Sequence, residues 1–158
     1  MKKKVTAGII FHDGKKFLAV KPTGQNRWDV PKGCVEKDEE HLEAALREVK
    51  EETDIDSYCI NKNFILDMGI RPYSNEKDIH LYVYYGNLDF IKLEECKCNS
   101  YFKNENGETL PEVEKYIFVQ HEQYERYFSG NMLRVINDIF EETNLCSKRQ
   151  IFERKNHD

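Results

Sequence analysis

The 158-residue sequence has no long apolar run, whereas a membrane-spanning helix needs roughly 18–20 consecutive apolar residues. After three lysines at positions 2–4, the apolar stretch from Val5 to Phe11 is too short for the core of a secretory signal. It ends in the polar sequence His12-Asp13-Gly14. We therefore expect a cytoplasmic protein with no membrane partner.

Cysteine and histidine motifs for metal binding are also missing. The five histidines show no HExxH or HxxxH spacing. The five cysteines are irregularly spaced and form no CxxC pair; they are Cys34, Cys59, Cys96, Cys98 and Cys146. An odd number without pairing favours reduced, mostly buried thiols over disulfides or a zinc site.

Aromatic residues, by contrast, are plentiful enough to build a core. Nine Phe, nine Tyr and one Trp accompany an apolar fraction of 39% and a charged fraction of 34%. A chain of about 100–200 residues usually forms one domain, and the sequence shows no repeat, linker or low-complexity segment. We expect one domain over residues 1–146 and a basic, frayed tail over 147–158.

The net charge of −5 is distributed unevenly along the chain. The window from Glu36 to Asp56 contains ten acidic and three basic residues, so it carries −7 and leaves +2 for the rest. The acidity is therefore local, and a local cause is expected.

Hydrophobic periodicity predicts a mixed sheet packed between helices. The expected strands are 4–11, 16–21, 58–70, 79–88 and 112–119, and an Asp-Gly turn joins the first two. The expected helices are 38–53, 121–128 and 131–144. Residues 28–31 form a short extended piece, and residues 89–110 form a polar connection.

The helix expected over 38–53 has two different faces. Asp38 is its expected N-cap, and the stripe that faces the core consists of Leu42, Ala45, Leu46, Val49 and Thr53. Glu48, Glu51 and Glu52 share another arc, where they repel one another. Two explanations stay open: a solvated acidic face, or a site for a hard cation such as Mg²⁺ that completes its shell with phosphate oxygens.

Residues 33–55 resemble the Nudix box, a pattern of Gly, Glu, Arg-Glu, an apolar residue, Glu-Glu, Gly and an apolar residue at fixed spacings. Eight of its nine specified positions match: Gly33, Glu39, Arg47, Glu48, Val49, Glu51, Glu52 and Ile55. The flanking segments 28–33 and 111–119 are also similar to those of the family. Asp54 replaces the second Gly of the pattern, and we expect it to adopt positive φ at a cost of about 1 kcal/mol.

The resemblance to Nudix hydrolases implies a fold and an activity. The expected fold is an α/β/α sandwich with a mixed sheet and the box as a loop–helix–loop. The expected reaction is the Mg²⁺-dependent hydrolysis of a nucleoside diphosphate linked to another group, with Mn²⁺ as the alternative cation. A non-catalytic protein that only binds nucleotides is the less favoured alternative, because every metal-binding carboxylate of the pattern is present.

By the same resemblance, Glu48, Glu51, Glu52 and Glu112 are the expected metal ligands, with a backbone carbonyl near Gly33. Either Glu52 or Glu112 is expected to accept the proton of the attacking water. Arg47 is expected to orient the glutamates through charge-assisted hydrogen bonds, and Glu39 to serve the structure of the box.

The sequence constrains the identity of the substrate less than it constrains the family. The segment around Trp28 looks most like members that act on dinucleoside polyphosphates and RNA 5′ ends, and a tyrosine 18 residues after Ile55, Tyr73, resembles the diadenosine-polyphosphate subgroup. We expect an Ap4A-like substrate. The alternatives are RNA 5′ ends, ADP-ribose or nucleotide sugars, and oxidised nucleotides; no partner protein is predictable.

Several side chains are candidates for substrate contacts. An exposed aromatic ring stacks well on a nucleobase, and the candidates are Tyr73, Phe102 and Tyr84. Basic side chains are candidates for phosphate contacts, namely Lys21, Arg27, Lys32 and Arg71, of which Lys32 is favoured because it adjoins Gly33.

Overall fold

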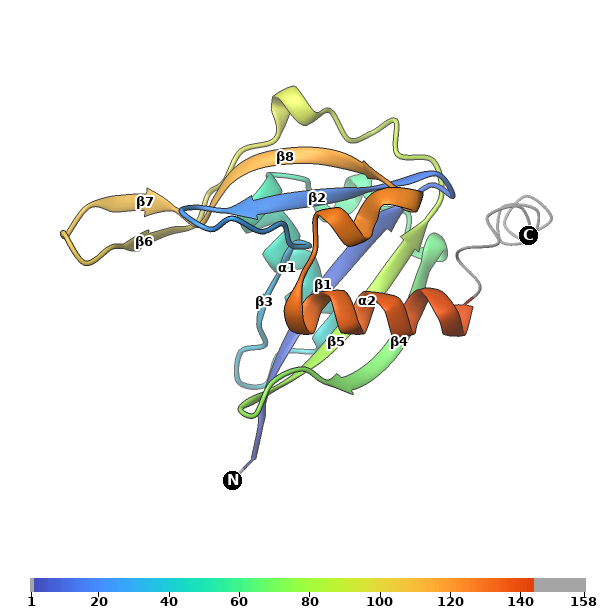
Figure 1. Cartoon of the computed structure of the whole chain (residues 1–158), viewed down its shortest axis with the longest axis horizontal. Coiled ribbons are helices and arrows are strands. Elements are labelled where there is room, and N and C mark those ends of the chain that lie inside the picture. Colours follow the sequence, from blue (N-terminus) through green and yellow to red (C-terminus); the bar gives the residue numbers. More distant parts are fainter. Residues whose placement is uncertain (1, 144–158) are drawn as a thin grey trace.

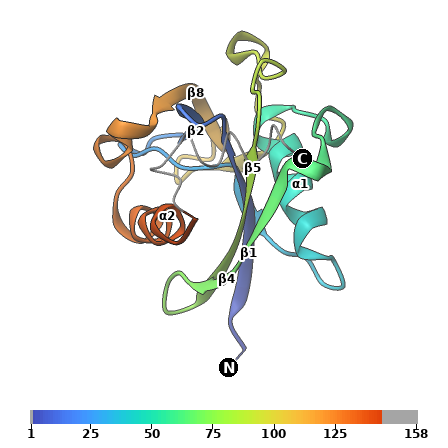
Figure 2. The ribbon, with the colours of Figure 1, turned by 90° about the vertical axis from the view of Figure 1, so that its right-hand side faces the viewer.

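The computed structural model describes residues 2–143, in which one long helix covers each face of a mixed sheet (Figures 1 and 2). The strands are β1 (Lys4–His12), β2 (Lys16–Pro22), β3 (Lys32–Cys34), β4 (Ile65–Pro72), β5 (Lys77–Tyr85), β6 (Tyr101–Lys103), β7 (Thr109–Pro111) and β8 (Val113–Gln120). The two α-helices are α1 (His41–Thr53) and α2 (Gly130–Thr143). The expected α/β/α sandwich is thereby confirmed.

The main sheet is ordered β4-β5-β1-β2-β8, and β3 joins it beside β1. Strands β1 and β5 run parallel, whereas the other pairs are antiparallel. One edge of β1 is shared, because β3 pairs with Thr6–Gly8 while β2 pairs at His12. Since β3 leads into the loop before α1, this pairing sets where that helix begins over the sheet.

Alternation along β5 divides the core into two layers. Ile79, Leu81, Val83 and Tyr85 pack in the layer that contains the apolar stripe of α2, and Tyr82 and Tyr84 pack in the layer that contains α1. This assignment of faces agrees with the sequence pattern. Tyr84 is only 5% exposed and packs against Phe11, Phe64 and Phe90, so the suggestion that it stacks on a base is wrong.

The start of α1 differs from the expectation. Asp38 is not the N-cap: it has φ 63°, and the helix begins at His41 after Glu40 in an extended conformation. The side chain of Glu39 explains the delay, because it accepts the backbone N–H of Glu36 and binds Arg47. These bonds hold residues 36–40 as a loop.

Three other boundaries also differ. The strand expected over 58–70 begins only at Ile65, since Ser57–Cys59 and Lys62–Phe64 form 3₁₀ turns. The helix expected over 121–128 is a 3₁₀ helix, His121–Arg126. The connection 89–110 contains a 3₁₀ turn and the β6–β7 ribbon, which sequence periodicity missed because each strand has only three residues.

The expectation that the cysteines are mostly buried is wrong for the described part of the chain. Cys34 and Cys59 are exposed, Cys96 and Cys98 are half-buried, and these four thiols are free. Cys146 and the tail 147–158 lie outside the described residues. Within residues 2–143, no helix combines the length and apolar character needed to cross a bilayer.

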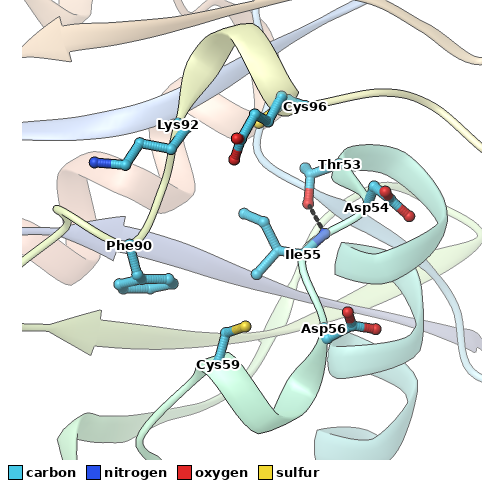
Figure 3. A pocket seen from close by; sticks show the side chains of 9 residues that line it. Thr53, Asp54, Ile55, Asp56, Cys59, Phe90, Lys92 and Cys96 are labelled. Atoms are coloured by element: carbon cyan, nitrogen blue, oxygen red, sulfur yellow. Dashed lines mark hydrogen bonds between the residues drawn. The ribbon is translucent and has the colours of Figure 1, made fainter.

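The C-terminal end of α1 follows the expectation for Asp54. This residue has φ 67°, ψ 13°, and its backbone N–H bonds to the carbonyl of Lys50, as in a left-handed helix cap. Its carboxylate accepts a hydrogen bond from Asn99 at 2.8 Å and pairs with Lys50 at 3.0 Å. Figure 3 shows the next turn, in which Thr53 Oγ1 accepts the N–H of Ile55 at 3.2 Å.

Replacing Asp54 by alanine should lower the free energy of unfolding by about 1 kcal/mol. Alanine must adopt the same left-handed conformation and lacks the carboxylate that bonds to Asn99. Asp54→Gly should stay closer to the wild type, since glycine relaxes the backbone although it also loses the carboxylate. Urea unfolding of the three proteins checks this order, and an alanine variant as stable as the glycine variant would contradict it.

Candidate active site

One arginine holds the glutamates of α1 together. Arg47 Nη1 donates to Glu48 Oε1 at 2.9 Å and to Glu51 Oε1 at 3.2 Å. Its Nε donates to Glu39 Oε2 at 2.8 Å, and its Nη2 donates to the carbonyl of Cys34 at 2.9 Å. These charge-assisted bonds raise the pKa of Arg47 above its usual range, with Glu39 as the largest cause.

Two carboxyl groups of the site are buried. Glu48 and Glu52 are each 7% exposed. Burial, followed by the charges of Glu51 and, more weakly, Glu112, raises the pKa of Glu48 to about 7, although Arg47 opposes the shift. Burial raises the pKa of Glu52 to about 8 against the influence of Lys32. The site is therefore short of positive charge.

Gly33 makes room for one of these carboxyl groups. A Cβ atom at this position would lie 2.0 Å from Cδ of Glu48. The backbone φ of Gly33 does not require glycine, because it is outside the left-handed region. Glycine is needed here for close approach, which lets the Glu48 carboxylate lie directly against the backbone of β3.

Glu52 and Glu112 line a pocket of about 190 Å³ together with Arg27, Asp29 and Lys32. Lys32 also donates its backbone N–H to Glu52 Oε1 at 3.2 Å. Acidic groups from α1 and from the bend before β8 thus share one cavity with two basic side chains. Such a cavity suits a ligand that carries phosphate groups and bound cations.

Asp29, which sequence reasoning missed, orients the basic side. It is 2% exposed and pairs with Lys32 Nζ at 2.8 Å and with Arg27 Nη1 at 3.0 Å. Burial by itself would lower the pKa of Lys32, but Asp29 and neighbouring groups raise it above its ordinary value. Lys32 therefore remains charged. The position of Asp29 beside Val30 and Pro31 gave no sign of this role.

The remaining candidates lie in different places. Tyr73 is close enough to Lys32 for their charges to interact, and its burial raises its pKa. Lys21 pairs with Glu114 on the neighbouring strand. Arg71 binds Glu142 of α2 and the carbonyl of Met68. Arg27 and Lys32 therefore line the pocket, whereas Tyr73 packs, partly buried, against the core layer that contains α2 and is not among the pocket's lining residues. Lys21 and Arg71 are engaged in other ion pairs.

The last four backbone carbonyls of a helix have no partner inside that helix. In α1, all four accept hydrogen bonds from residues outside the helix. Asn99 bonds to two of them: its side chain donates to Lys50 at 3.2 Å and its backbone to Glu51 at 2.6 Å. Tyr116 Oη donates to the carbonyl of Glu52 at 2.5 Å, and the N–H of Lys97 donates to Thr53 at 3.3 Å. The pattern of the box gives no sign of these residues, because they come from a later segment.

A second pocket, of about 170 Å³, lies beyond the C-terminal end of α1 (Figure 3). Its lining includes Ile55, Cys59, Phe90 and Cys96, and none of the predicted site residues. Burial raises the pKa of Cys96 to about 11, so this thiol stays protonated. Of the box glutamates, Glu52 lines the first pocket, and none lines this one.

The carboxylate set fits a divalent cation. Gly33 lets the Glu48 carboxylate lie against the backbone of β3, and the buried acids lack positive charge. Among residues 2–143, no three His, Cys, Asp or Glu side chains are already grouped so that they could hold a metal by themselves. Mg²⁺ usually keeps several waters and binds through one or two carboxylates together with substrate phosphates, so a preformed all-protein cage is not required.

A model of the NUDIX domain matches residues 2–128, which include the box, Lys32 and Glu112. This chain belongs to the NUDIX family. As a Nudix hydrolase it acts on phosphoanhydride bonds of nucleoside diphosphate derivatives. An uncharacterised 17.7 kDa protein of Enterobacteria phage T4, from the e–segB intergenic region, is 34% identical in an alignment of 147 positions that covers 87% of this chain and 96% of that protein.

Other relatives resemble this Nudix hydrolase more distantly. A 57-residue segment is 44% identical to subunit 2 of the mRNA decapping complex of Schizosaccharomyces pombe, covering 35% of this chain and 7% of that protein. The NUDIX domain of Shewanella oneidensis NrtR, solved with ADP ribose, has a TM-score of 0.63 at 14% identity and 90% coverage of both chains. A C. elegans Ap4A hydrolase complex has a TM-score of 0.57 at 20% identity, covering 96% of this chain and 98% of that one. These two structures show the fold that they share with it.

Gly33→Ala should lower activity strongly while it leaves the fold nearly intact. The new methyl group must displace the end of the flexible Glu48 side chain, which moves a carboxylate of the site at little cost to packing. We expect at least a tenfold higher Mg²⁺ concentration for half-maximal rate, with thermal unfolding changed by only a few degrees. Rates over a Mg²⁺ titration and a melting curve measure both effects.

Gly86→Ala is the matched control, because the nearest atom to its Cβ would lie 3.5 Å away, an ordinary contact. Equal Mg²⁺ dependence of the two variants would contradict the role of Gly33.

Proposed function

We propose that this Nudix hydrolase cleaves the polyphosphate chain of dinucleoside polyphosphates with Mg²⁺ and water. The observation that supports this most is the shared pocket, in which Glu52 and Glu112 accompany Lys32 and Arg27. Phosphates need both kinds of group, since basic side chains bind them directly and carboxylates bind them through cations. Tyr73, close to Lys32, is available on the same side for the nucleobase.

Glu48, Glu51, Glu52 and Glu112, with the carbonyl of Gly33, would hold the cation. When bound, Mg²⁺ neutralises phosphate charge and lowers the pKa of water, and Mn²⁺ can supply the same chemistry. Bonds from Arg47 keep Glu48 and Glu51 together against their mutual repulsion.

Substrate phosphates are bound by Lys32 and Arg27, whose positions Asp29 sets. Water attacks a phosphorus atom, the bridging P–O bond on the opposite side breaks, and the proton of the water passes to a carboxylate. Glu52 and Glu112 both line the pocket and are the two groups placed to accept that proton.

RNA 5′ ends are the second candidate substrate. The local similarity to a subunit of an mRNA decapping complex supports this alternative. Both substrates contain the same reacting group, a polyphosphate attached to a 5′ carbon. They differ in the group that the polyphosphate carries beyond the site of cleavage, which is a single nucleoside in the first case and a polynucleotide in the second.

Glu52→Gln should reduce kcat by about 10²- to 10⁴-fold, the usual contribution of a general acid or base. The fold should persist, because glutamine has nearly the same size as glutamate and its amide oxygen can still accept the backbone N–H of Lys32. Steady-state rates with Ap4A and melting curves test this.

Glu43→Gln, on the exposed side of α1, is the matched control and should keep the wild-type rate. Wild-type turnover by Glu52→Gln would remove Glu52 from the site. Loss of activity in Glu112→Gln alone would assign the proton to Glu112.

Ap4A should be hydrolysed with a higher kcat/KM than triphosphorylated RNA, ADP-ribose, a nucleotide sugar or an oxidised nucleotide. Mass spectrometry of the products, with Mg²⁺, with Mn²⁺ and after chelation, measures substrate choice and metal dependence together. Activity should vanish on chelation and return with added Mg²⁺. A preference for RNA would favour the second candidate, and hydrolysis that persists after chelation would contradict the carboxylate site.

A further inference from the structure

A short ribbon extends from the body of the molecule beside the active site. Strands β6 and β7 pair only with each other and project away from the main sheet (Figure 1). Tyr101 is 59% exposed and Phe102 is 38% exposed, and they are two of the four large apolar side chains that are exposed among the described residues. Successive residues of a strand point to opposite faces, so each ring is exposed on its own side of the ribbon.

The register of the ribbon connects Phe102 to the active site. Tyr101 pairs with Pro111 and Phe102 with Leu110, and the N–H of Glu112 continues the ladder by bonding to the carbonyl of Ser100. Side chains alternate along a strand and directly opposed residues share a face. Phe102 and Leu110 are therefore on one face, and Glu112, which lines the pocket, follows Leu110 by two residues at the bend between β7 and β8.

The base of the ribbon is attached to the helix that carries the metal-binding glutamates. Asn99 bonds to the carbonyls of Lys50 and Glu51 and to the carboxylate of Asp54. On the other side, the N–H of Thr23 bonds to the carbonyl of Glu112 at 3.0 Å. These bonds fix the ribbon relative to Glu52, whereas an isolated two-stranded ribbon would be only marginally stable.

The distance along the ribbon suits a substrate that reacts at Glu112. Leu110, the partner of Phe102, precedes Glu112 by two residues. At about 3.3 Å per residue, this spacing corresponds to about 7 Å along the chain. A nucleoside joined to the reacting phosphates extends beyond them over such a length, so its base can reach the ring of Phe102. Tyr73 is near Lys32 and not on the ribbon, so it can contact the other nucleoside.

We propose that the face of the β6–β7 ribbon carrying Phe102 binds the second nucleobase of a dinucleoside polyphosphate by stacking, as a direct continuation of the pocket lined by Glu112. This inference rests on the proposed function and adds a binding site to it. Stacking tolerates any base, because every base has an aromatic face. The ribbon therefore distinguishes substrates with two nucleosides from those with one.

Binding measurements test the ribbon separately from turnover. In the Glu52→Gln background, calorimetry with Mg²⁺ compares Ap4A with adenosine 5′-tetraphosphate, which has the same phosphates and no second nucleoside. Phe102→Ala should weaken Ap4A binding by about 5- to 150-fold, the range for loss of one stacked base. Binding of adenosine tetraphosphate should change by less than about twofold.

Two control variants isolate stacking from structure. Phe102→Tyr keeps an aromatic ring and should restore most of the Ap4A affinity. Tyr58→Ala removes an aromatic ring that is 83% exposed and lies outside the ribbon, and it should leave both affinities unchanged. Melting curves of all variants should stay near that of the parent, because Phe102 is outside both core clusters.

The possible results distinguish the two proposals. Equal effects of Phe102→Ala on both ligands, no effect, or no measurable Ap4A binding by the parent would overturn the ribbon site. If Phe102→Ala weakens binding of a 5′-triphosphorylated dinucleotide more than binding of Ap4A, the ribbon binds RNA and the proposed occupant is wrong. Phe102→Ala could weaken Ap4A binding selectively while the wild-type enzyme fails to hydrolyse Ap4A. That result would support the ribbon site and contradict the proposed reaction.

Discussion

The electrostatic constraint at the centre of this structure is the crowding of carboxylates on one face of α1. Glu48 and Glu51 share one guanidinium nitrogen of Arg47, and the same guanidinium binds Glu39 and the carbonyl of Cys34. Arg47 therefore joins the helix, the loop before it and strand β3. Without that cation, like charges so close together would separate.

Burial adds to the same constraint. Glu48 and Glu52 are shielded from water, and their pKa values rise to about 7 and 8 because the charged form is poorly solvated. The protein thus leaves a demand for positive charge that Arg47 and Lys32 meet only in part. A divalent cation would meet that demand, and it would need no rigid all-protein cage if substrate phosphates complete its shell.

Segments that are distant in the sequence hold this arrangement in place. The carbonyls at the end of α1 accept hydrogen bonds from Lys97, Asn99 and Tyr116. The segment 97–100, which leads into the β6–β7 ribbon and is called the strap, and strand β8 therefore both support the helix. The strap continues directly into the ribbon, and the ribbon into Glu112. One continuous stretch of chain therefore supports the glutamates, supplies another carboxylate and carries the exposed aromatic side chains.

Much of the fold follows from local sequence patterns. Hydrophobic periodicity predicted the strand that forms β5 and the helix that forms α2, because burial of apolar surface depends on these periods. The left-handed conformation of Asp54 was also expected from its place at the end of the box helix. The N-cap at Asp38 was wrong, because the side-chain bonds of Glu39 keep residues 36–40 out of the helix.

The sequence alone determined the family, the helix that carries the carboxylates, and the close relation of Arg47 and Gly33 to them, since all of these lie within one short motif. The tertiary structure alone decided which later residues meet that motif. Asp29 orients Lys32 and Arg27, Asn99 and Tyr116 bond to the end of the helix, and Lys21 pairs with Glu114. Phe102 pairs with Leu110, two residues before Glu112. The physical reason is that these contacts depend on strand register and on the bonding needs of a helix end, which join residues that no local pattern relates.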